Sequence, residues 1–143
     1  MNFLVLSLLL VLVVVATICD LRDREVPDWI SLTILAWAVL ATTLGWTTGG
    51  WLGLVYGFSL GLVLSASVFY MGGLGGGDVK LIAALGAAVG PLGLLVVLFW
   101  MALTGAILAL VAISRGKKDF AYVPAIAVGL MVYLAFLGNM QIS

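Results

Sequence analysis

Long apolar stretches alternate with short charged segments along this chain. Residues 3–19, 29–77, 81–114 and 120–137 carry no charged side chain, and the acidic and basic residues gather between them. A helix that crosses a bilayer needs about 20 mainly apolar residues, because the hydrocarbon core is about 30 Å thick. The pattern therefore predicts an all-α, polytopic membrane protein.

Two of these stretches are long enough for two crossings each, and each contains an internal break. The glycines of residues 45–50 indicate a turn in the first stretch. In the second, Pro91 can begin a helix but cannot continue the one before it, so a break is expected at Gly90 and Pro91. The helix before this break is long enough to cross only if it begins near Gly76. The six predicted transmembrane helices are residues 3–19, 29–44, 51–71, 76–89, 91–113 and 120–137.

The basic residues predict how these helices are oriented. Lys and Arg collect in the cytoplasmic loops of membrane proteins. With six crossings, all six basic residues fall on one side, which places both termini outside. If the fourth segment entered the membrane and returned, Arg115 would lie opposite Arg22, against this rule. We therefore expect one multi-pass domain, residues 1–143, in the cell membrane. The basic residues are Arg22, Arg24, Lys80, Arg115, Lys117 and Lys118.

Composition narrows the chemistry that the chain can perform. Hydrophobic residues make up 65% of the chain and charged residues 8%, which excludes a water-soluble domain. The net charge is zero and no basic tract is present, so nucleic acid is not an expected partner. The chain has no histidine and a single cysteine, Cys19, so neither a metal centre nor a disulfide is expected. No cofactor is predicted, and any chemistry must come from carboxylates.

Two of these carboxylates stand out by position. Six crossings place Asp20, after the first span, and Asp78, near the start of the fourth, at the same cytoplasmic level. An ionisable side chain at the edge of a membrane helix is costly, which makes it a functional candidate. Two carboxyl groups in one site can share a proton, so that one activates water while the other polarises a carbonyl group. The alternatives are that Asp20 is only a charge at a helix end, or that the nearby Asp23 takes its role.

Three segments, in order, resemble one known family. They read DLRDREVPD at residues 20–28, GGGDVK at residues 75–80 and AYVPAIAVG at residues 121–129. This set resembles the type IV prepilin and preflagellin peptidases, the GxGD membrane aspartic proteases. The resemblance implies that Asp20 and Asp78 are the catalytic aspartates. It also implies that the second motif shapes the approach of the substrate, through Gly75, Gly76, Gly77 and Lys80. The backbone of its glycines can adopt conformations closed to other residues, which would let a substrate strand come close to the aspartates.

The resemblance also implies a substrate class. Members of this family cleave the basic leader peptide from pilin-like or archaellin-like precursors at the cytoplasmic membrane face, so lipid is a further expected contact. Larger relatives carry an inserted domain with cysteine pairs and also methylate the new N-terminus. The interval 21–28 has no room for that domain, so we expect a peptidase without methyltransferase activity. A bacterial or archaeal system is left open, and so is the oligomeric state, with a homo-oligomer as one option.

Alternative interpretations remain for the protein and for its loop acids. A lipoprotein signal peptidase also uses two membrane aspartates, and a small proton- or ion-conducting protein also places carboxylates in a membrane. Asp28 follows a proline and precedes an apolar run, which predicts a helix N-cap. Asp23, Glu25 and Asp28 are either solvated loop acids or a surface that attracts the basic leader.

Overall fold

The computed structural model describes residues 3–23, 25–47, 49–116 and 123–142, and within these ranges every regular element is an α-helix. This confirms the predicted all-α class. The first helix runs past the predicted end of its span at residue 19, so Asp20 lies inside it. The predicted start of the last span, residues 120–122, lies outside the described residues. The helices are α1 (Phe3–Asp23), α2 (Asp28–Thr43), α3 (Gly50–Tyr70), α4 (Gly76–Ser114) and α5 (Val123–Ile142).

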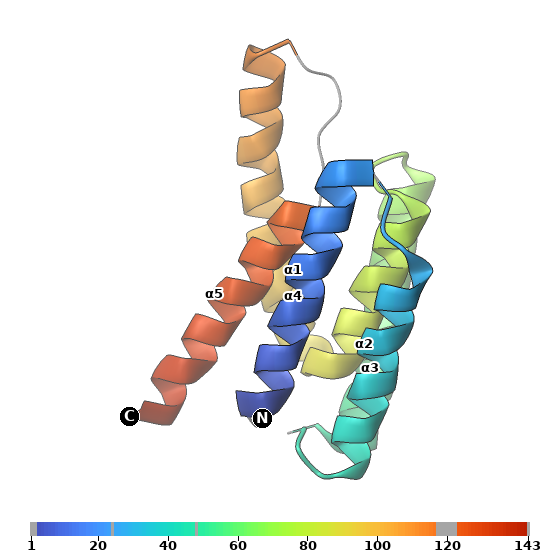
Figure 1. Cartoon of the computed structure of the whole chain (residues 1–143), viewed down its shortest axis with the longest axis vertical. Coiled ribbons are helices and arrows are strands. Elements are labelled where there is room, and N and C mark those ends of the chain that lie inside the picture. Colours follow the sequence, from blue (N-terminus) through green and yellow to red (C-terminus); the bar gives the residue numbers. More distant parts are fainter. Residues whose placement is uncertain (1–2, 24, 48, 117–122, 143) are drawn as a thin grey trace.

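The long helix α4 is broken where Gly90 precedes Pro91. Its 39 residues would measure about 58 Å if straight, about twice the thickness of a bilayer core. Gly90 has a non-helical backbone with φ 78° and ψ 174°. Leu94, just past the break, lies back against the first half, with its Cδ2 atom 3.0 Å from the position of a Cβ on Gly86. The two halves therefore form a hairpin and run in opposite directions (Figure 1).

Small residues allow α3 and the first half of α4 to lie unusually close together. A Cβ on Gly57 would overlap the carbonyl oxygen of Gly86, and a Cβ on Gly61 would lie 2.9 Å from the Ile82 oxygen. Small side chains permit such close backbone approach between membrane helices. One turn further along α3, the buried Ser65 hydroxyl lies 3.4 Å from the Val79 oxygen. These contacts fix the start of α4, which carries Asp78.

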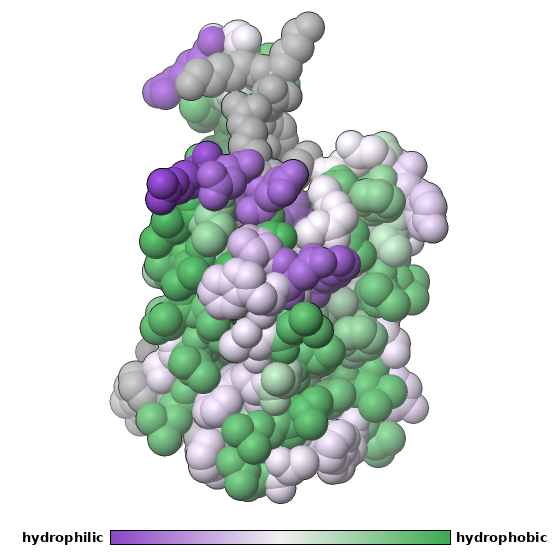
Figure 2. All heavy atoms as spheres, turned by 45° about the vertical axis from the view of Figure 1, so that its right-hand side comes forward, coloured by the Kyte–Doolittle hydropathy of each residue, from purple (hydrophilic) through white to green (hydrophobic). Residues whose placement is uncertain are grey.

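The surface is what the sequence predicts for a protein in lipid. Large apolar side chains such as Leu92, Ile113 and Leu52 are 79%, 72% and 70% exposed, and apolar patches of this extent are uncommon on soluble monomers. By length and composition, α1, α3 and α4 can each cross a membrane, and α2 and α5 contribute shorter apolar segments. Hydrophilic residues gather toward the upper end of the molecule, above a mainly apolar surface (Figure 2). The chain is thus a multi-pass membrane protein.

The helix ends separate into two levels. α1, α3 and α4 end toward the upper end of the molecule, whereas α1 starts and α5 ends at the lower end (Figure 1). Arg22 lies in the last turn of α1 and Arg115 caps the C-terminal end of α4. The remaining basic residues of the orientation argument, apart from Lys80, lie outside the described residues; they are Arg24, Lys117 and Lys118.

Candidate active site

A polar cavity lies where the last turn of α1, the segment before α2 and the first turn of α4 meet. Its volume is about 310 Å³. The structure therefore brings Asp20 and Asp78 together from helices that are remote in the sequence, together with the three glycines of the predicted motif. The lining residues are Asp20, Glu25, Val26, Asp28, Gly75, Gly76, Gly77 and Asp78.

Both aspartates are buried at this cavity. Asp20 is 7% exposed and Asp78 is 8% exposed, and both line the same cavity. The Oδ1 atom of Asp78 is buried and has no hydrogen-bond partner within the described part of the chain. A buried polar atom without a partner is costly in a folded protein, so a donor from a bound molecule is expected there. Asp78 also lies in the first turn of α4, where the helix dipole stabilises negative charge.

One glycine of the motif, Gly77, is needed for space. A Cβ on Gly77 would lie 3.1 Å from the Val26 carbonyl oxygen, and one on Gly75 would lie 3.5 Å from Asp78 Oδ2. None of the three motif glycines has a positive φ, and Gly75 is extended at φ −80° and ψ 156°. None of the three therefore adopts a conformation that requires glycine, and only at Gly77 would a side chain crowd the neighbouring main chain. The role of the motif in the approach of the substrate stays a prediction.

Lys80 and Asp28 form an ion pair beside the cavity. Lys80 Nζ donates to Asp28 Oδ2 at 2.8 Å, and their side chains are 57% and 64% exposed. The predicted N-cap role of Asp28 is wrong. Pro27 occupies the cap position without a side-chain hydrogen bond, and Asp28 is the first residue of α2. The carboxylate instead joins the start of α2 to the start of α4.

The acidic residues near Asp20 differ in where they lie. Glu25 and Asp28 line the cavity, whereas the exposed Asp23 at the end of α1 does not. Asp23 was the alternative to Asp20 as the partner of Asp78, and the structure does not place it at the cavity of Asp78. Sequence reasoning considered Glu25 only as a solvated loop acid or as part of a surface that attracts the leader, and it did not single out Val26. Both belong to the first of the three family-like segments. Within the described residues, no three acidic or cysteine side chains converge as metal ligands.

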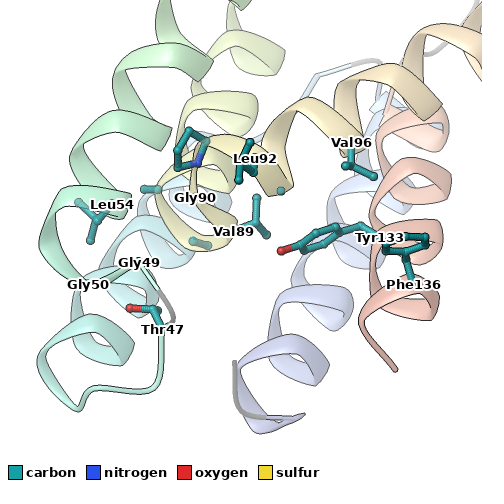
Figure 3. Close-up of a pocket in the computed structure, with 15 residues that line it drawn as sticks. Thr47, Gly49, Gly50, Leu54, Val89, Gly90, Leu92, Val96, Tyr133 and Phe136 are labelled. Carbon is teal, nitrogen blue, oxygen red and sulfur yellow. The ribbon is translucent and has the colours of Figure 1, made fainter. Parts of the chain in front are cut away.

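A larger cavity lies elsewhere, at the break in α4. Its volume is about 590 Å³, and Figure 3 shows that Val89, Gly90 and Leu92 contribute to it together with Tyr133 and Phe136. No carboxylate is among its described lining residues. The smaller acidic cavity is the candidate active site, because it alone combines buried ionisable groups with space for a ligand among the cavities described above.

Comparison with known proteins gives the family of the chain. Residues 7–110, which include Asp20 and Asp78, match the type IV leader peptidase family. The chain belongs to this family. It is similar to a prepilin leader peptidase/N-methyltransferase of Bacillus subtilis (strain 168), with 33% identity over 131 residues. The match covers 86% of this chain and 52% of the relative, so the chain spans about half the length of that leader peptidase. No solved structure matches the chain significantly.

Proposed function

We propose that this protein is a membrane aspartic endopeptidase that cleaves the basic leader peptide from pilin-like or archaellin-like precursors. The observation that carries the proposal is that Asp20 and Asp78 line one cavity in a member of the type IV leader peptidase family. Both carboxyl groups are buried, and each comes from a different helix. Peptide hydrolysis by an aspartic protease requires two carboxyl groups at one site, and this cavity contains them.

The chemistry follows from burial of two like charges. Two neighbouring carboxylates do not readily ionise together in a buried site, so one holds a proton while the other is charged. The charged carboxylate removes a proton from water, which attacks the scissile carbonyl carbon. The protonated carboxyl group donates a hydrogen bond to the carbonyl oxygen, and a proton then passes to the leaving amine as the C–N bond breaks. This cycle uses neither metal nor cofactor.

We place this reaction at the cytoplasmic face of the cell membrane, in a protein with six crossings. The hairpin of α4 supports two crossings from one helix, since Gly90 interrupts it and Leu94 lies back on Gly86. Arg22 and Lys80 lie at the level of the cavity, on α1 and α4 respectively. Basic residues favour the cytoplasmic side, so the cavity faces the compartment in which precursors are made.

We also propose that cleavage is not followed by methyl transfer. Only residues 24–27 separate α1 from α2, so this interval does not hold the inserted domain that the resemblance associates with methylation. Mass spectrometry of the cleaved product should show an unmodified N-terminal amine. A product heavier by one methyl group would contradict this part of the proposal.

Co-expression with a pilin-like precursor tests the peptidase activity directly. The wild-type protein should convert the precursor to a faster-migrating product. Asp20→Asn and Asp78→Asn should each abolish conversion while leaving the protein in the membrane, because each removes one member of the acid–base pair. Asp23→Asn is the matched control, since it neutralises an exposed acid on α1 outside the cavity, and it should retain conversion. Cleavage that persists in either cavity variant would end the proposal.

A further inference from the structure

The cavity that holds the aspartate pair carries more negative charge than hydrolysis requires. Four carboxylates line it: Asp20 and Asp78 are buried, whereas Glu25 and Asp28 are exposed to solvent. No basic side chain is among the described lining residues. The exposed pair therefore forms an acidic rim around a buried acidic centre, and an electrostatic field of this sign favours a cationic ligand.

A second observation indicates that a ligand enters this cavity. Asp78 lines the cavity and is 8% exposed. Its Oδ1 atom finds no hydrogen-bond donor among the described residues. Buried carboxylate oxygens are normally satisfied by donors. A peptide substrate whose scissile bond reaches this buried centre passes the exposed acids, which brings another part of the peptide against Glu25 and Asp28.

The ion pair with Lys80 shows that Asp28 can bind a cationic side chain. The Lys80 ammonium group donates to Asp28 Oδ2 at 2.8 Å although both side chains remain largely exposed. Exposed ion pairs contribute little to stability, because water competes for both charges. A cationic side chain from a substrate can therefore replace Lys80 at Asp28 at small cost. Glu25 has no such partner among the described residues and can accept from the same cation.

We propose that Glu25 and Asp28 form a subsite for a lysine or arginine side chain of the substrate's leader, and that Lys80 occupies Asp28 until the substrate displaces it. This inference rests on the proposed peptidase function and adds the residues that select its substrate. An arginine fork would bind the two carboxylates through several charge-assisted hydrogen bonds. Cation binding at the rim holds the leader while the scissile bond lies at Asp20 and Asp78.

The test compares two forms of one precursor, with lysine or with glutamine at the basic positions of the leader. The purified wild-type protein in lipid nanodiscs should cleave the lysine form with a kcat/KM about tenfold higher, as expected for charged hydrogen bonds. Glu25→Gln combined with Asp28→Asn should reduce this ratio to about one, by lowering kcat/KM for the lysine form toward the value for the glutamine form. Asp23→Asn is the control and should keep the tenfold preference.

Lys80→Met separates displacement from a structural role. If Lys80 competes with the substrate, its removal should raise the ratio of kcat/KM for the lysine form to kcat/KM for the glutamine form about two- to threefold. A purely structural ion pair would instead lower both values equally, which would overturn the displacement step.

Binding measurements keep the proposal testable if the double variant loses all activity. Asp78→Asn removes hydrolysis, and fluorescence anisotropy then reports the affinity for a labelled lysine or glutamine leader peptide. The lysine peptide should bind more tightly, and adding Glu25→Gln should remove most of that difference. If the variants at Glu25 and Asp28 kept the preference for the lysine peptide, the subsite would be refuted, and the proposed peptidase function would stand. Absence of any cleavage by the wild-type protein would instead refute the proposed function itself.

Discussion

Gly77 lies directly against the main chain of Val26. A Cβ atom on Gly77 would lie 3.1 Å from the Val26 carbonyl oxygen and 3.2 Å from its Cβ atom. Through this contact the segment before α2 rests on the first turn of α4, one residue away from Asp78. The position of the Asp78 carboxyl group in the cavity therefore depends on the absence of a side chain at its neighbour.

Gly77→Ala should impair catalysis more than the same change at the adjacent glycine. The new methyl group must push the first turn of α4 away from Val26, and small misplacements of catalytic groups can lower rates by about tenfold to a hundredfold. At Gly76 the nearest atom to a new Cβ is Phe69 Cε2 at 4.0 Å, an ordinary contact. Gly76→Ala should therefore stay within about twofold of the wild type in kcat/KM. Equal losses in both variants would show that the Val26 contact is not the reason.

Gly57→Ala should destabilise the protein. Its methyl group would overlap the Gly86 carbonyl oxygen, which is backbone and cannot rotate away. Overpacking of this kind costs about 1–3 kcal/mol. Gly53→Ala is the matched control on the same helix, because no atom lies within 4 Å of its Cβ, and alanine is favoured over glycine in helices by about 1 kcal/mol. Unfolding of the two variants in mixed detergent micelles measures both effects, and a stable Gly57→Ala protein would contradict the close packing of α3 on α4.

The helices could be predicted from the sequence because lipid imposes a simple rule on them. Uninterrupted apolar stretches must be helical where no water can satisfy the backbone, and Gly90 with Pro91 marks a break in any helix. The end of α1 was less predictable. The uncharged stretch ends at Cys19, yet the helix continues to Asp23, because leucine and arginine have high helix propensity in water.

The aspartate pair was also predictable, whereas its surroundings were not. Asp20 and Asp78 follow from family-like motifs and from the alternation of the spans. The ion pair of Asp28 with Lys80 does not, because a local pattern of proline, acid and apolar run favours a cap. Its partner lies in another helix, and only tertiary packing brings the two together. The placement of Glu25 at the cavity has the same origin.

Gly90→Ala should destabilise the hairpin of α4 through backbone strain alone. Gly90 has φ 78° and ψ 174°, a region that is costly for residues with a side chain by about 1–3 kcal/mol. No atom lies within 4 Å of a new Cβ there, so steric overlap cannot contribute. Gly53→Ala again serves as the control, with open surroundings but a helical backbone. The free energy of unfolding in detergent should fall below the wild-type value for Gly90→Ala and rise above it for Gly53→Ala. Equal stability of the two variants would mean that the break at Gly90 is not maintained in the membrane.

Six crossings can be tested by labelling single cysteines in a Cys19→Ala background with a membrane-impermeant maleimide. Met71 and Leu92 are 85% and 79% exposed, and Arg115 caps the end of α4. Because α4 reverses at Gly90, cysteines at 71 and 115 should react only in inverted vesicles, and a cysteine at 92 only in intact spheroplasts. If α4 crossed once as a single helix, positions 71 and 115 would react from opposite sides. The basic residues would then lie on both sides of the membrane and would no longer place the cavity of Asp20 and Asp78 at the cytoplasmic face.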